Sequence, residues 1–112
     1  MARLSPQWFH ILLSLADRDL HGLAITKDVF ERTDGQLHLW PGMLYGALKK
    51  MTDEGLIDEA AAPREFSAGG GRPKFYRITP YGRRVCAAEA ERLARFVDTA
   101  RAKRLIKRPR PT

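Results

Sequence analysis

The chain has 112 residues, of which 44% are hydrophobic, with one cysteine and a formal net charge of +7. This length fits one small domain with an appended element and excludes a TIM barrel, while the apolar content excludes a charged disordered chain. No stretch approaches the roughly 20 apolar residues of a membrane span, and we expect neither a signal peptide nor a membrane partner. One cysteine cannot form an internal disulfide, which agrees with the cytoplasmic location that we expect.

The positive charge is concentrated in two blocks. Residues 66–88 carry five basic side chains and residues 100–112 carry six, and neither block contains an acidic one. The first 65 residues carry 7 basic and 10 acidic side chains. Clustered positive charge favours a polyanionic partner, nucleic acid before membrane. A solubilising surface with a frayed tail explains the same distribution equally well.

The first two helices are predicted from caps and apolar spacing. Ser5 and Pro6 suit a helix cap and a first turn. Apolar residues then recur at helical spacing, which predicts a helix over 6–17. Its apolar face is formed by Trp8, Ile11, Leu12 and Leu15. A second helix is expected over 21–32, before a glycine-containing stop signal at residues 33–35.

A third helix is predicted over 41–54, because Pro41 suits its first turn and Gly55 closes it. One face of this helix is apolar at positions i, i+4 and i+7, so we expect it to pack inward. That face is formed by Leu44, Leu48 and Met51.

The apolar period then changes, which predicts two strands. The first is expected over 57–66, weakened by Pro63 to an edge strand. The second is expected over 74–79, and the residues between them contain three consecutive glycines and must form a loop. The two strands therefore form a hairpin with a long, basic tip.

The last predicted helix covers 80–106, because Thr79 and Pro80 form a cap and a first turn. A helix of this length cannot bury its apolar stripe on so small a domain, so we expect a second copy to cover it. The helix over 6–17 is expected to join this homodimer. The predicted interface residues are Trp8, Ile11, Ala90, Leu93, Phe96, Val97 and Ala100.

The order of three helices, a hairpin and a long helix predicts a fold that is mainly α with a small β-hairpin (α+β). Three helices and a hairpin make a winged helix-turn-helix, in which helices two and three form the DNA-reading pair. We expect a DNA-binding domain over 1–79, a dimerisation helix over 80–106 and a basic tail over 107–112.

Four short motifs in this order resemble PadR-type transcriptional regulators. Residues 21–25 (HGLAI) resemble the HGYxI opening of their second helix, and residues 41–48 (PGMLYGAL) resemble the GTLYxxL start of their recognition helix. Residues 55–57 (GLI) and 74–82 (KFYRITPYG) resemble the family's strand start and wing end. The single C-terminal helix is similar to the short branch of the family.

The resemblance implies a dimeric DNA-binding regulator, a repressor, that reads a palindromic operator with half-sites about one DNA turn apart. Two positions depart from the family pattern. Met43 stands where a Thr or Ser is usual, and Trp40 replaces a small or polar residue. Trp40 is expected either to pack against the second helix or to touch the nucleic-acid backbone.

The N-terminal end of the third helix is the expected DNA-reading element, because free N–H groups and the helix dipole favour phosphate there. Glycines permit close backbone approach, a tyrosine binds phosphate or sugar, and lysines reach phosphates or guanine edges. The candidate residues are Gly42, Met43, Tyr45, Gly46, Lys49 and Lys50. The alternative is that Tyr45 only packs and the lysines form a solvated face.

The wing, residues 67–74, is glycine-rich and basic. Gly71, Arg72 and Pro73, followed by Lys74, are similar to the core of AT-hook peptides. We therefore expect Arg72 to enter the minor groove and to prefer A·T-rich flanks. Lys74 and Arg77 complete the predicted DNA contacts. The alternative is a wing tip that makes only loose phosphate contacts.

No catalytic or metal site is expected. The histidines and the cysteine, at positions 10, 21, 38 and 86, are scattered, and no nucleophile–base pair is spaced for catalysis. We therefore expect no enzyme activity and no cofactor. Two other functions stay open: a winged-helix module that binds protein, and a regulator that holds an aromatic effector at the dimer interface with Trp8 and Phe96.

Overall fold

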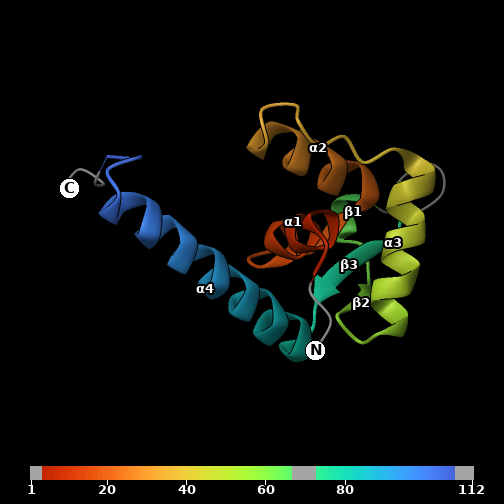
Figure 1. The fold of residues 1–112 in the computed structure, drawn as a ribbon. Helices are drawn as coiled ribbons and strands as arrows, with labels where there is room; N and C mark the ends of the chain where they lie inside the picture. The colour runs from red at the N-terminus through yellow and green to blue at the C-terminus, as the bar shows by residue number, and fades with distance from the viewer. Residues whose placement is uncertain (1–3, 67–72, 108–112) are drawn as a thin grey trace.

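The computed structural model describes residues 4–66 and 73–107, and this part consists of helices around a small antiparallel sheet (Figure 1). The fold is therefore mainly α with a β-hairpin, which confirms the predicted class. In chain order the elements are α1 (Pro6–Leu15), β1 (Leu20–His21), α2 (Gly22–Arg32), α3 (Pro41–Asp53), β2 (Ile57–Ala60), the 3-10 helix η1 (Arg64–Phe66), β3 (Phe75–Ile78) and α4 (Pro80–Ala102).

Side-chain caps fix where three of the helices begin. The Ser5 hydroxyl accepts a hydrogen bond from the Trp8 amide at the start of α1, and the Thr79 hydroxyl accepts one from the Gly82 amide at the start of α4. His21 caps α2 in the same way, since its Nδ1 accepts from the Ala24 amide at 3.2 Å. These bonds satisfy N–H groups that have no partner within the helix.

Three helices end earlier than the sequence predicts, α3 by a single residue at Asp53. Helix α1 ends at Leu15 rather than at residue 17, and α4 ends at Ala102 rather than at residue 106. In α4 the reason is a closing turn, in which Arg104 adopts a left-handed φ of 62° and the Leu105 amide bonds back to the Ala100 carbonyl. This geometry satisfies carbonyls at the helix end and stops its continuation.

The sheet has three strands in the order β1–β3–β2, one more than the hairpin that the sequence predicts. The extra strand β1 has two residues, with Leu20 opposite Tyr76 and His21 opposite Phe75. A strand this short has no alternation that a sequence pattern could reveal. Strand β2 stops at residue 60 instead of 66, because the chain turns into η1 after Pro63.

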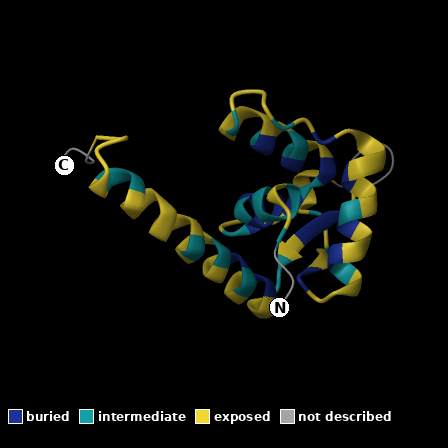
Figure 2. Ribbon diagram, viewed as in Figure 1, coloured by how far each residue is buried: buried dark blue, intermediate teal, exposed yellow. Residues whose placement is uncertain are grey.

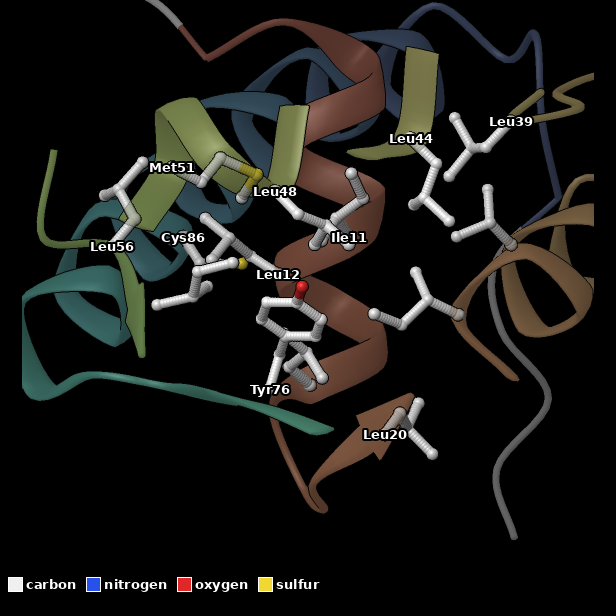
Figure 3. Packing of buried hydrophobic residues seen from close by; sticks show 14 residues of the cluster. Ile11, Leu12, Leu20, Leu39, Leu44, Leu48, Met51, Leu56, Tyr76 and Cys86 are labelled. Atoms are coloured by element: carbon white, nitrogen blue, oxygen red, sulfur yellow. The ribbon is translucent and has the colours of Figure 1, made fainter. Parts of the chain in front are cut away.

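The hydrophobic core lies where α1 crosses α3 and the sheet. Figure 3 shows Leu44, Leu48 and Met51 of α3 beside Ile11 and Leu12 of α1, and all five are buried. The predicted inward stripe of α3 is thereby confirmed. Ile11 is 0% exposed within a single chain, so it has no surface for a partner. The prediction that Ile11 lies in a dimer interface is wrong, because its side chain is completely buried in the core of its own chain.

The start of α4 is attached to the sheet at one point of very close approach. The Thr79 hydroxyl donates to the Gly55 carbonyl at 2.6 Å, and a Cβ built on Gly82 would lie 2.0 Å from the Leu56 carbonyl oxygen. Beyond the buried Cys86, α4 runs away from the domain, and its far half is largely exposed (Figures 1 and 2). The start of α4 is therefore fixed to the sheet, while the rest of this long helix extends into solvent.

Candidate nucleic-acid interface

Helix α3 turns one face to the core and the other to solvent (Figure 2). Its buried stripe fixes the rotation of the helix, so the residues between the stripe positions must face outward. Six of the predicted DNA-contact residues lie on this exposed side: Gly42, Met43, Tyr45, Gly46, Lys49 and Lys50.

Two glycines leave the exposed face of α3 without side chains. A Cβ built on Gly42 or on Gly46 meets no atom within 4 Å, so neither position needs a glycine for packing. Neither residue has a positive φ. Glycine in a helix interior costs about 1 kcal/mol relative to alanine. The fold therefore gives no reason for these two glycines, while a ligand that approaches the backbone closely would require them.

Tyr45 lies against the start of α2 and is also open to solvent. A Cβ on Gly22 would come within 2.8 Å of the tyrosine Oη, so this glycine makes room for the ring. The side chain nevertheless remains 51% exposed. The contact with α2 positions the Tyr45 ring and leaves part of it open to solvent. Tyr45 can therefore both pack against α2 and contact a ligand, the two alternatives that the sequence leaves open.

An open groove of about 830 Å³ lies between α3, the start of α2 and the β2–β3 hairpin. Two of the predicted lysines line it, and each is paired with a carboxylate of the same groove. Lys49 Nζ lies 3.4 Å from Asp53 Oδ2, and Lys74 Nζ lies 3.3 Å from Glu59 Oε1. All four side chains are exposed, so these pairs add little to folding stability. Their effect is to cancel the positive charge of these two lysines.

The N-terminus of α3 carries exposed aromatic and apolar side chains. Trp40 occupies the N-cap position without a side-chain cap hydrogen bond. Its indole stacks on His38, with ring centroids 3.9 Å apart, and His38 meets the edge of Phe30 in α2. Trp40 is thus linked to α2 through His38, and it stays 61% exposed. Met43 is 42% exposed, and the Gln7 amide donates to its sulfur at 3.3 Å.

Arg77 lies away from this groove. Successive strand residues face opposite sides of a sheet, and its neighbour Tyr76 lines the groove. Arg77 instead forms an ion pair with Asp19 at 3.2 Å. On that same side Arg83 donates to the Ala16 carbonyl at the end of α1. The structure therefore does not bring Arg77 together with the exposed face of α3.

The base of the wing is held by three aromatic rings. His21, Phe66 and Phe75 contact one another edge to face, with centroids 5.2 to 5.7 Å apart. The sequence does not predict this cluster, because the apolar pattern places Phe66 at the end of a strand and His21 at the start of a helix. Residues 67–72, with the predicted minor-groove residue Arg72, lie outside the described residues.

The far half of α4 presents an uncovered apolar face. Leu93, Phe96 and Val97 are exposed there, Phe96 by 58%, and the guanidinium of Arg92 lies 5.3 Å from the Phe96 ring centre. Ala90 is exposed and Ala100 is half-buried. Of the two predicted interface residues in α1, Trp8 remains half-buried at the edge of the core.

Burial shifts the pKa of two groups that lie away from α3. Burial, and next the charge of Arg32, lower the pKa of His10, and burial raises the pKa of the Cys86 thiol. Within residues 4–66 and 73–107, no three metal-ligating side chains cluster. No helix in the same part of the chain is long and apolar enough to cross a membrane.

The helix-turn-helix of α2 and α3, followed by a hairpin, defines a winged helix-turn-helix protein. A family model described as "Transcriptional regulator PadR-like family" matches residues 11–88, which is more than half of the chain. The chain belongs to the PadR-like family of transcriptional regulators.

Similar proteins agree with this assignment. A PadR family transcription regulator from Clostridium difficile R20291 is 27% identical and superposes with a TM-score of 0.72 over 91% of this chain and 100% of that one. Bacillus subtilis PadR, solved in complex with operator DNA, is 23% identical with a TM-score of 0.61 over 93% of this chain and 49% of that one.

A curated relative extends the comparison to a longer protein. An uncharacterized 37.1 kDa protein in transposon TN4556 of Streptomyces fradiae is 38% identical over 86 residues, which cover 77% of this chain. The matched region spans 22% of that protein's length, so the relative is far longer than the part it shares with this chain.

Proposed function

We propose that the protein is a dimeric, sequence-specific DNA-binding regulator, a repressor, that places α3 in the major groove of an operator. The observation that carries this proposal is the bare exposed face of α3, where Gly42 and Gly46 have no packing role. Glycines on this face allow the helix backbone to approach DNA closely, and the flanking Tyr45 and Lys50 are proposed to supply phosphate contacts. Family membership and the operator complex of Bacillus subtilis PadR support the same assignment.

The wing is proposed to lie beside the helix on the DNA. Lys74 lies immediately before β3 in the groove that borders α3, so a duplex seated on α3 comes within its reach. Arg72 is proposed to enter the minor groove there and to favour A·T-rich flanks. Replacing Arg72 with alanine should then abolish a preference for A·T-rich over G·C-rich flanks.

The dimer is proposed to form through α4. An exposed stripe with Leu93, Phe96 and Val97 lies on a helix that leaves its own domain, and a second copy can cover it symmetrically. Leu93→Asp should yield monomers by light scattering and weaken binding to a palindromic operator at least a hundredfold. Ala88→Asp, on a different face of α4, is the matched control and should remain dimeric. A monomeric unmodified protein would refute this part.

The decisive experiment is selection of bound duplexes from a random pool at a stated salt concentration. We expect a palindromic sequence with half-sites about one turn apart, and an affinity that falls steeply with salt. Failure to enrich any sequence, with a shallow salt dependence, would favour the alternative that this winged helix binds an acidic protein.

An aromatic effector at the dimer interface is a second candidate. Phe96 is exposed on the proposed interface and carries a cation over its ring, an arrangement that can hold a flat aromatic compound. Quenching of tryptophan fluorescence across a panel of aromatic compounds would test it, with Phe96→Ala as the variant that should lose the response.

A further inference from the structure

The first turn of α3 exposes two large apolar side chains, Trp40 and Met43, which we call the apolar edge. They stand next to a helix face that otherwise consists of glycine, tyrosine and lysine. Neither belongs to the buried core. Large apolar groups left in water at one end of a helix indicate a surface that a ligand covers.

Both side chains are held in place before any ligand arrives. The Trp40 indole lies flat on His38, which in turn contacts Phe30, so one face of the indole is packed. The Met43 sulfur accepts a hydrogen bond from Gln7 of α1. A surface fixed in this way loses little side-chain entropy on binding.

The position of the apolar edge determines which ligand it can meet. The proposed dimer face lies on the far half of α4, which Figure 1 places on the opposite side of the domain from α3. A second copy seated on α4 therefore does not cover the apolar edge. The N-terminal residues of a recognition helix contact base edges in the major groove. Among the groups that base pairs present there, the thymine C5-methyl is the apolar one.

We propose that Met43, supported by Trp40, packs on thymine methyl groups in the major groove and so determines part of the sequence preference. This inference rests on the proposed function, since it presumes that α3 enters the groove. It adds the chemical group that the apolar edge recognises, which neither the fold nor the family assigns to these residues.

The test removes the methyl group from the DNA. In the duplex that selection provides, each thymine is replaced singly by deoxyuridine, and the dissociation constant is measured at fixed salt. At one or two positions per half-site we expect about a fourfold loss, the value of burying one methyl group. Thymines elsewhere in the duplex should tolerate the replacement.

Met43→Gln identifies the residue responsible, because glutamine keeps the length and the helix propensity of methionine but is polar. The variant should bind the thymine and uracil duplexes equally at those positions. Lys50→Gln on the same helix is the matched control, which should weaken binding to both duplexes and keep the fourfold difference. No uracil effect, or one that survives Met43→Gln, would overturn the inference.

Fluorescence examines the second residue of the apolar edge. The chain has two tryptophans, so Trp8→Phe leaves Trp40 as the reporter. Duplex binding should shield the exposed indole from iodide. An indole that stays equally accessible in the complex would show that DNA does not cover the apolar edge. If no duplex is bound at all, the proposed function fails first, which the selection experiment reveals separately.

Discussion

Glycines occur in two helices of this molecule for opposite reasons. At the start of α4, Gly82 is demanded by the fold, because any side chain would enter the Leu56 carbonyl. On the exposed face of α3, Gly42 and Gly46 border open space. The same residue type thus marks a packing contact in one helix and an available surface in the other. The comparison distinguishes residues that are needed for packing from residues that are exposed and available to a ligand.

The largest effect is expected at the packing glycine. Gly82→Ala places a Cβ 2.0 Å from a backbone oxygen, which no side-chain movement can relieve. The strand or the helix must shift, and we expect the free energy of unfolding to fall by about 3 kcal/mol, as for severe overpacking. Denaturant unfolding measures it. Stability equal to that of the original protein would mean that α4 is not attached as described.

The second prediction concerns the exposed glycine and has two readouts of opposite sign. Gly46→Ala should raise the free energy of unfolding by up to about 1 kcal/mol, because alanine is the better helix former. It should also weaken operator binding about tenfold, since its methyl group holds the helix off the DNA. Calorimetry and a binding titration on one preparation test both. A stabilised variant with undiminished affinity would contradict the role given to this face.

These two glycines also show what a sequence can reveal. The helices and the inward stripe of α3 follow from local caps and apolar spacing, and the structure agrees. The role of a glycine cannot be predicted from the neighbouring sequence, because Gly82 and Gly46 differ in which distant parts of the chain pack against them.

The same limit explains the residues that the sequence misplaced. Ile11 lies on the expected apolar face of α1, but whether that face meets the core or a partner depends on where α3 packs. Arg77 belongs to a basic block in sequence, yet strand alternation turns it toward Asp19. Strand β1 forms by pairing with β3, and its two residues are too few to show a strand pattern in the sequence.

A smaller effect is expected from the carboxylates of the groove. Glu59→Gln removes the partner of Lys74, which then meets a phosphate without competition. We expect affinity for arbitrary duplex DNA to rise about threefold, since a charge at some 4 Å is worth on the order of 1 kcal/mol in water. The salt slope should steepen by up to about 0.9. Asp98→Asn, which frees Arg101 on α4, is the control that should leave both unchanged.

The smallest expected effect is on the pH dependence of the free energy of unfolding, which His10 should change without changing DNA binding by the exposed face of α3. His10 lies between α1 and α2, where burial and then the charge of Arg32 lower its pKa, so the folded protein favours the neutral ring. The unfolded chain takes up a proton near pH 6.5, earlier than the folded protein does.

The stability that depends on this neutral ring is therefore complete above pH 6.5 and is lost as the pH falls through the lower pKa of the folded state. His10→Gln should make the free energy of unfolding less dependent on pH in that window. Operator affinity at pH 7.5 should be the same for His10→Gln and the unmodified protein, because His10 serves the α1–α2 contact and lies outside the α3 face. A loss of affinity there would mean that the region that builds the domain and the surface it presents are not separable.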